Sequence, residues 1–200
     1  MTAVVASCAF IVASGIAVTW WVPQLVRLMR VGNSGVSSGT WALYAASAGV
    51  WAVWALLSGS WLFGIVQSVE TVGILAVVVV LRAWRLFLLL TAAMGVFLLL
   101  ALAGGSVLVG VVGIAVTAGS RFPQIRKSVL SPDVRGVSAW SWTIGLIGNV
   151  SWIIWSVAND MWLFALTCLT AVLASMVIIA ATQVRTWRAA PRGGDDAVTL

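Results

Sequence analysis

An internal duplication constrains this chain more than any other feature of its sequence. The pair Pro23-Gln24 recurs as Pro123-Gln124, and nine positions between residues 35 and 63 recur with an offset of 101. All four tryptophans of that stretch are among the matches, which chance rarely produces, so the chain is predicted to be two copies of one unit. The matched segments are Gly35-Val36-Ser37 with Gly136-Val137-Ser138, Trp41 with Trp142, Trp51 with Trp152, Trp54 with Trp155, and Trp61-Leu62-Phe63 with Trp162-Leu163-Phe164.

The composition predicts that both copies lie in a membrane. The chain is 62% hydrophobic and only 8% charged, whereas a soluble domain is about 25% charged. Apolar stretches of about 20 residues, the length that crosses a bilayer, recur along it. We therefore predict seven spans, at residues 3–22, 39–58, 61–81, 86–103, 105–122, 139–158 and 161–183.

The basic residues predict the orientation. All 11 fall at the first, third and fifth loops or in the C-terminal tail of a seven-span arrangement. The positive-inside rule makes that side cytoplasmic, with the N-terminus outside and the C-terminus inside. The net charge of +6 is therefore topological and does not indicate nucleic-acid binding; the expected surroundings are the lipid bilayer, most simply of the cell membrane. The basic residues are Arg27, Arg30, Arg82, Arg85, Arg121, Arg126, Lys127, Arg135, Arg185, Arg188 and Arg192.

The number of spans per copy predicts the fold class. Three crossings leave a chain on the opposite side, so a second copy in the same orientation requires one extra span, and the fourth span has no counterpart in either copy. We expect an all-α membrane protein with seven transmembrane helices arranged 3+1+3. Its two parallel triple-helix bundles would be related by a pseudo-twofold along the membrane normal. The predicted units are a first bundle at 1–85, a linker helix at 86–104, a second bundle at 105–184 and a disordered cytoplasmic tail at 185–200.

The repeated Pro-Gln pairs are candidate hinges. Proline cannot donate to the carbonyl four residues back, and a carbonyl freed inside a membrane needs another partner. The neighbouring amides of Gln24 and Gln124 are able to supply one. A single pair would read equally well as a plain helix exit, but its repetition at Pro23 and Pro123 favours a hinge near the cytoplasmic end of spans one and five.

Two tryptophans lie too deep to be ordinary interfacial anchors. Trp51 and Trp152 are each about seven residues, or roughly 10 Å, inside their spans. Such a pair, one per copy, is able to flank a ligand on the pseudo-axis by stacking or cation–π contact, and the alternative is packing within the bundle. Most other tryptophans are expected in the aromatic belts of the membrane surface. These are Trp61 and Trp162 on the outer side, and Trp41, Trp84, Trp140, Trp142 and Trp187 on the inner side.

Polar side chains inside spans are the remaining candidates for a site. Glu70 is the one acidic residue within a predicted span, and Gln67 lies one turn before it on the same face. Glu70 reads either as a group that couples transport to protons or cations, or as a structural hydrogen-bond partner. Asn149 lies one turn before the deep tryptophan of the second copy, and Cys8 and Cys168 read as packing residues.

Enzymatic function is not expected. The sequence has no histidine, paired carboxylates, metal-ligand cluster or phosphate-binding glycine loop, so no metal or cofactor is predicted.

These residues resemble the PQ-loop superfamily, with a spacing close to the SWEET and SemiSWEET sugar transporters. The resemblance covers about residues 3–82 and 105–183. It implies triple-helix bundles packed in the order one-three-two, Pro-Gln hinges for alternating access, and a substrate site lined by a tryptophan and by an asparagine of the third helix. The tryptophan matches Trp51 and Trp152, whereas the asparagine is replaced by Gln67 and Cys168.

The departure leaves the solute open among three hypotheses. The first is a SWEET-like carrier of a small polar solute, with sugar the leading class, bound by the deep tryptophans with Gln67 and Asn149. The second is a proton-coupled carrier of amino acids or other charged solutes that uses Glu70, because other superfamily members such as cystinosin are proton-coupled. The third is a receptor or accessory protein, since the KDEL receptor shares the architecture. The sequence does not decide between a monomer and a homo-oligomer.

Overall fold

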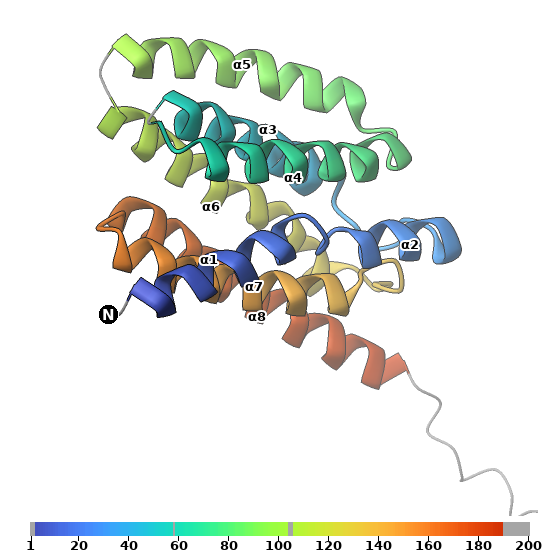
Figure 1. Cartoon of the computed structure of the whole chain (residues 1–200). Coiled ribbons are helices and arrows are strands. Elements are labelled where there is room, and N and C mark those ends of the chain that lie inside the picture. The colour runs from blue at the N-terminus through green and yellow to red at the C-terminus, as the bar shows by residue number, and fades with distance from the viewer. Residues whose placement is uncertain (1–2, 58, 104–105, 190–200) are drawn as a thin grey trace, which may run out of the picture.

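The computed structural model describes residues 3–57, 59–103 and 106–189, and those residues form eight α-helices with connecting turns and loops (Figure 1). The first predicted span, 3–22, corresponds to α1 and the short turn after it, and α2 continues the same apolar stretch to Val31. The helices are α1 (Ala3–Ala17), α2 (Val22–Val31), α3 (Ser38–Leu57), α4 (Trp61–Val80), α5 (Trp84–Ala103), α6 (Ser106–Leu130), α7 (Ala139–Ala158) and α8 (Trp162–Ala189).

These helices confirm the predicted all-α membrane fold. Within the described residues, five stretches have both the length and the apolar character to cross a membrane: Ala3–Val31, Trp61–Val80, Leu108–Leu130, Ala139–Ala158 and Trp162–Arg188. The other two helices, α3 and α5, have 20 residues each, which at 1.5 Å per residue gives the roughly 30 Å of a bilayer core. Counting α1 and α2 as one span gives seven.

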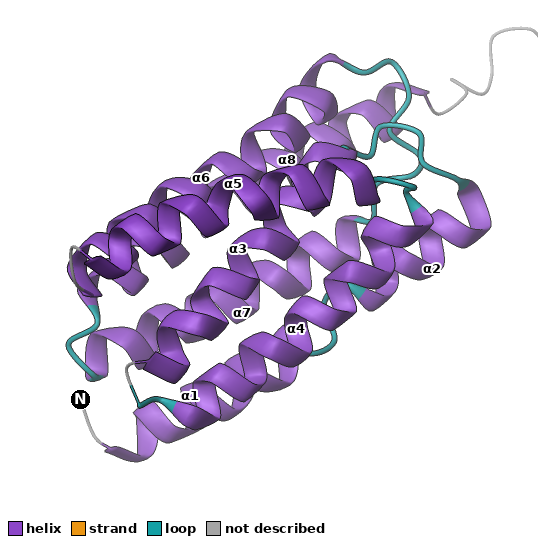
Figure 2. Cartoon of the chain, turned by 90° about the horizontal axis from the view of Figure 1, so that it is seen from above, coloured by secondary structure: helices purple, strands orange, loops and turns teal. Residues whose placement is uncertain are grey.

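The packing of the helices follows the duplication. In the first copy α4 packs against both α3 and the α1–α2 span, and in the second copy α8 packs against both α7 and α6. The copies meet through reciprocal contacts, because α1 lies along α7 while its equivalent, α6, lies along α3. Figure 2 shows the helices with their axes roughly aligned and with the loops gathered at the two ends. The unduplicated α5 packs on α3 and α6.

The two ends of the bundle differ in their connections (Figure 1). At one end lie the longer loops 32–37 and 131–138, which follow α2 and α6; we call this the loop end. At the other lie the short α3–α4 and α7–α8 turns, which we call the turn end. The loop end carries the basic residues of the described chain other than Arg121, and it is the predicted cytoplasmic side.

Two helices are longer than the sequence predicted. α6 was expected to end at residue 122 but continues through Pro123 to Leu130. α8 continues to Ala189, so the beginning of the predicted disordered tail is helical. The side chains of Arg126 and Lys127 therefore project from the end of a helix and not from a loop. The rest of the predicted tail, residues 190–200, lies outside the described residues.

The belt prediction is wrong for two tryptophans. Trp41 and Trp142 are 1% and 3% exposed, and both pack on the buried indole of Trp20, with ring centroids 5.3 and 6.4 Å away. They belong to the core because the first turns of α3 and α7 face the interface between the copies. The other predicted belt tryptophans are exposed, as that position requires: Trp61, Trp84, Trp140, Trp162 and Trp187.

Candidate functional site

The Pro-Gln glutamine of the first copy holds the second copy. Gln24 is buried, its Nε2 donates to the Gly136 carbonyl (2.8 Å), and its Oε1 accepts from the Ser138 backbone N–H (2.8 Å). One side-chain amide thereby satisfies a donor and an acceptor of a loop that belongs to the other bundle. Both bonds are buried, where an unpaired backbone group is costly.

The second copy returns the same contact. Gln124 donates from Nε2 to the Gly35 carbonyl (3.0 Å) and accepts at Oε1 from the Ser37 N–H (2.8 Å). We call these reciprocal bonds of Gln24 and Gln124 the glutamine clasp. The expectation that each amide would satisfy the carbonyl freed by its own proline is wrong for both residues. Each amide donates from Nε2 and accepts at Oε1, and a loop of the other copy offers the matching carbonyl and N–H.

The loops gripped by the clasp also interlock with each other. The Gly136 N–H donates to the Ser34 carbonyl (3.0 Å). A Cβ added at Gly136 would lie 2.6 Å from that carbonyl oxygen, and one added at Gly35 would lie 2.7 Å from the Asp133 carbonyl oxygen. Gly35 in addition has φ +74°, a conformation that favours glycine. Two backbones of different copies thus meet at distances that admit no side chain.

The two prolines, predicted to be equivalent, lie in different local structures. Pro23 is the second residue of α2, after a break that separates it from α1, whereas Pro123 lies inside the continuous helix α6. The break at residues 18–21 carries Trp20, whose indole reaches across to Glu70. The equivalent residue of the second copy, Ser120, donates instead to the carbonyl of Thr117 in its own helix (2.7 Å). The hinge role of both prolines stays a prediction.

An aromatic group closes the turn end of the interface. Phe63 packs on Trp152 with centroids 5.1 Å apart, and its equivalent Phe164 packs on Trp51 at 4.9 Å. The two phenylalanines also contact each other, at 5.1 Å. We call these four residues the aromatic plug; like the clasp, it consists of reciprocal contacts between the copies.

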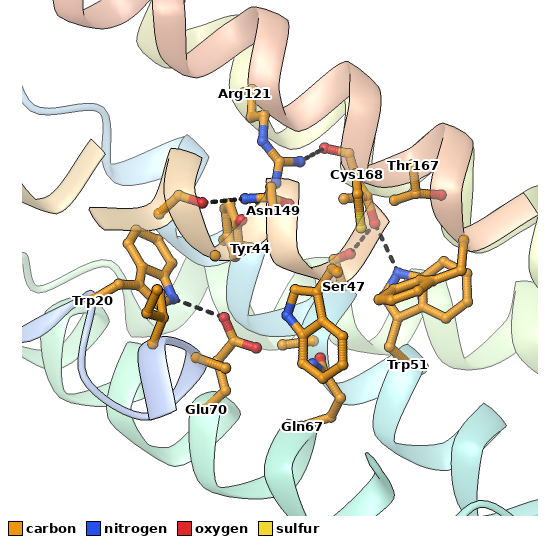
Figure 3. A pocket seen from close by; sticks show the side chains of 18 residues that line it. Trp20, Tyr44, Ser47, Trp51, Gln67, Glu70, Arg121, Asn149, Thr167 and Cys168 are labelled. Carbon is orange, nitrogen blue, oxygen red and sulfur yellow. Dashed lines mark hydrogen bonds between the residues drawn. The ribbon is translucent and has the colours of Figure 1, made fainter. Parts of the chain in front are cut away.

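A small cavity lined by polar and aromatic side chains (Figure 3) adjoins the plug, because Trp51, Trp152 and Phe164 line it. Toward the loop end, Gln124 of the clasp follows the lining residue Arg121 by about one turn of α6. The volume of the cavity is about 60 Å³, well below the roughly 300–1,000 Å³ of pockets that take drug-sized ligands. Residues of α1, α3, α4, α6, α7 and α8 and of the turn after α1 line it. The cavity brings together every binding and coupling residue predicted from the sequence: Trp51, Gln67, Glu70, Asn149, Trp152 and Cys168. Their roles in binding stay predictions.

Hydrogen bonds fix several of these side chains. Glu70, 8% exposed, accepts from the indole Nε1 of Trp20 at 2.7 Å. Trp51 donates from Nε1 to the Thr117 hydroxyl (3.0 Å), which also shares a 2.5 Å bond with the hydroxyl of Ser47. Asn149 donates from Nδ2 to a carbonyl of its own helix (2.7 Å). The carboxylate and the deep tryptophan of the first copy are therefore both held by donors and acceptors from other helices.

Sequence reasoning missed Arg121, which it assigned to a loop. The residue is 2% exposed, lines the cavity from α6, and donates from Nη1 to the Thr117 carbonyl (2.6 Å) and from Nη2 to the Tyr44 hydroxyl (2.5 Å). Its guanidinium carbon also lies 4.7 Å from the centroid of the Tyr44 ring. Its position inside the predicted span 105–122, before the proline, was the signal that would have found it.

This fold and site define a class: a polytopic membrane protein of transporter-like architecture, in which two three-helix copies enclose a polar cavity. Residues 105–164, which begin with α6 and end in α8, match the family model described as PQ loop repeat. The chain therefore contains a PQ-loop repeat, and the resemblance to the PQ-loop superfamily is confirmed. No curated protein matches the chain.

Proposed function

We propose that this protein carries a small polar solute across the membrane by alternating access through the central cavity. One observation carries the proposal: a polar cavity between two duplicated bundles is bounded at both ends by contacts that each copy makes with the other. Such contacts are able to break at one end while those at the other hold, because no covalent or intrahelical bond has to break.

The glutamine clasp is suited to act as the gate at the loop end. Its four hydrogen bonds each contribute about 0.5–1.5 kcal/mol net, so opening the clasp costs a few kcal/mol. A cost of this size leaves a minor open state populated, which alternating access requires. The break between α1 and α2 before Pro23 provides a bending point beside the clasp. Opening the loop end there would connect the cavity with the predicted cytoplasmic side.

Sugar remains the leading solute class on the strength of the SWEET-like spacing. The indole faces of Trp51 and Trp152 suit the apolar face of a sugar ring, and the amides of Gln67 and Asn149 supply donors and acceptors for hydroxyls. The cavity has to enlarge for such a solute, because its present volume of about 60 Å³ is small. The aromatic plug and the clasp are the contacts whose separation would enlarge it.

Glu70 supports a second candidate, a proton-coupled carrier. Its carboxyl group is buried at the cavity with the Trp20 indole as its partner, and no cationic group of the described residues lies within salt-bridge distance of it. A carboxyl group in that position exchanges protons only when the cavity opens, which is the requirement for coupling proton movement to solute movement.

Flux in proteoliposomes tests both candidates. The purified chain would be reconstituted, and uptake of labelled sugars and amino acids would be compared with and without a pH gradient. The uncoupled carrier predicts sugar uptake that is indifferent to the gradient and survives Glu70→Gln. The coupled carrier predicts uptake driven by the gradient and abolished in Glu70→Gln. Absence of flux for every solute would contradict transport and favour a receptor.

A further inference from the structure

We propose that Arg121 forms an anion subsite of the cavity and that the solute places a carboxylate there. The inference rests on the proposed transport function, and for the same cavity it names a charged substrate class in place of sugar. It applies to any solute that enters from either side, because Arg121 lines the central cavity itself (Figure 3).

Glu70 lines the same cavity as Arg121, but no carboxylate of the described residues lies within salt-bridge distance of its guanidinium. An arginine is protonated under all physiological conditions, and a buried charge is stable only when it is paired or well hydrogen-bonded. Within the described residues the one salt bridge joins Arg135 to Asp133 in the exposed loop. Arg121 bonds only to neutral oxygens, those of Thr117 and Tyr44. A positive charge in a membrane interior is thus left open to an anion that enters the cavity.

The hydrogen-bonding capacity of Arg121 is also unfilled. Nε is buried without a hydrogen-bond partner. Nη2 is bonded to a phenol hydroxyl that also belongs to the cavity lining and is able to move aside. Nε and one Nη form the planar fork that binds both oxygens of a carboxylate. A solute carboxylate would therefore satisfy the orphan Nε and displace or share the bond to Tyr44.

A purely structural role is a poor account of this arginine. The equivalent position of the first copy holds Trp21, whose ring packs against Gly73 so closely that an added Cβ there would lie 2.0 Å from it. The repeat therefore does not require an arginine at this position, although Trp21 lies in the break before α2 and Arg121 lies inside the continuous α6. Tyr44 is likewise not repeated, because Gly145 takes its place in the second copy. The pair Arg121–Tyr44 is a local addition to one half of the cavity.

Glu70 lines the same cavity, and its charge state distinguishes two kinds of carboxylate solute. A zwitterion would place its ammonium group at Glu70 and its carboxylate at Arg121, so both charges of the site would be paired. A hydroxy acid would use Arg121 alone and would require Glu70 to be neutral. A sugar would satisfy neither charge. Alanine and lactate, which differ only in an ammonium and a hydroxyl group, separate the two forms.

Binding is the first test. The full chain in lipid nanodiscs would be titrated with the proteinogenic amino acids and with lactate and other 2-hydroxy acids, and ligand-induced shifts of the thermal unfolding midpoint would be recorded. Alaninol, which lacks the carboxylate of alanine, glucose and sodium chloride serve as matched probes. We expect carboxylates of the panel to stabilise the protein and alaninol and glucose not to. If sodium chloride raised the unfolding midpoint as much as every carboxylate does, the site would be a general anion site, and the proposal would be overturned.

Variants assign the effect to Arg121. Loss of a charged bidentate contact lowers affinity roughly ten- to hundredfold, which is the change expected for Arg121→Gln. Arg121→Lys keeps the charge without the fork and should retain part of the affinity. Arg126→Gln is the control, because this arginine is exposed on the same helix. If Arg121→Gln does not fold, Arg121→Lys alone decides, since unchanged affinity there would contradict a bidentate contact.

The outcomes separate this inference from the transport proposal. Carboxylate binding that depends on Arg121, without flux in proteoliposomes, would keep the subsite and reject transport. Sugar flux that is unchanged in Arg121→Gln, with no carboxylate binding, would keep transport and reject the subsite. Carboxylate affinity that is the same in wild type and Arg121→Gln, or no stabilisation by any carboxylate of the panel, would overturn the proposal outright.

Discussion

The two copies of the repeat are alike at the loop end and differ at the central cavity. At the loop end equivalent residues make the same contacts in both copies, because each Pro-Gln glutamine forms hydrogen bonds with the Gly-Val-Ser backbone of the other copy. In and around the cavity the pair Trp51 and Trp152 is kept, but other equivalent positions carry different side chains. The differing pairs are Gln67 and Cys168, Glu70 and Ala171, Trp21 and Arg121, and Tyr44 and Gly145.

This contrast follows from what each region has to contact. At the loop end each copy contacts the other, so a pseudo-twofold is satisfied by one sequence used twice. In the cavity the partner is a solute, and small metabolites rarely have twofold symmetry. An asymmetric solute gains from an asymmetric site, and the charged groups Glu70 and Arg121 come from non-equivalent helices, α4 and α6.

The interlocked glycines at the loop end should give the largest effect. Gly35→Ala and Gly136→Ala each drive a Cβ against backbone of the other copy at 2.6–2.7 Å, and Gly35 additionally loses its favoured φ of +74°. We expect Gly35→Ala to be the worse of the two, by roughly 1 kcal/mol or more of added backbone strain. Thermal unfolding in detergent measures the difference. Wild-type stability in either variant would contradict the close approach of the loops.

The clasp gives the next largest effect, and its bonds to the loop of the other copy are lost equally from both sides, although Gln124 also loses a bond to Ser128. Gln24→Leu and Gln124→Leu each leave a backbone N–H and a carbonyl unpaired, at about 1–3 kcal/mol for each buried group. We expect both variants to open the loop end and to increase the reactivity of a cysteine placed at Ser47 in the cavity.

Labelling of that cysteine with a membrane-impermeant maleimide, in vesicles that expose the loop end, is the measurement. The control is the same cysteine in a chain with Gln183→Leu, a glutamine that is exposed near the end of α8 and takes no part in the clasp. A clear difference between the two clasp variants would break the symmetry that the reciprocal bonds imply.

Much of the architecture follows from sequence, since the repeat, the apolar stretches and the basic loops each record a physical constraint. The all-α membrane fold was predictable from these, and Trp51, Gln67 and Glu70 were chosen because polar or bulky groups deep in a span are rare. Contacts between the copies were not predictable. The glutamine clasp depends on where a loop of the other copy lies, and no local pattern encodes that position.

Arg121 and Trp41 were misassigned for a related reason. Both lie near the ends of predicted spans, where a basic or aromatic residue ordinarily meets the membrane surface. Burial there depends on whether the helix face meets lipid or the other copy. The continuation of α6 to Leu130 moves Arg121 a further two turns from its end, and the first turn of α3 faces the second copy.

The asymmetry of the cavity should give a smaller, measurable effect on the paired tryptophans. Trp51→Phe removes the hydrogen bond from the indole N–H to the Thr117 hydroxyl, and it thereby loosens the bond between Thr117 and Ser47. Trp152→Phe also leaves an aromatic ring in place, but it removes no side-chain hydrogen bond to the described residues. We expect Trp51→Phe to weaken solute affinity several-fold, in line with about 0.5–1.5 kcal/mol for one hydrogen bond, and more than Trp152→Phe. Affinities from the nanodisc titration provide the comparison. Equal losses in both variants would indicate that the tryptophans act through packing alone.

The smallest effect should come from the loop ion pair, which belongs to one copy only. Hydrogen bonds from Arg135 lower the pKa of the exposed Asp133 carboxyl from 3.8 to about 2. Because the folded-state pKa is depressed, the stabilisation is fully present above pH 3.8 and disappears as the pH falls through about 2. The stabilisation by the Asp133–Arg135 pair is therefore constant between about pH 5 and 8. Asp133→Asn should leave the unfolding midpoint nearly unchanged there, because exposed pairs contribute little. A large loss of stability in Asp133→Asn would mean that this side chain, and not only the backbone of the interlocked loops, holds the loop end closed.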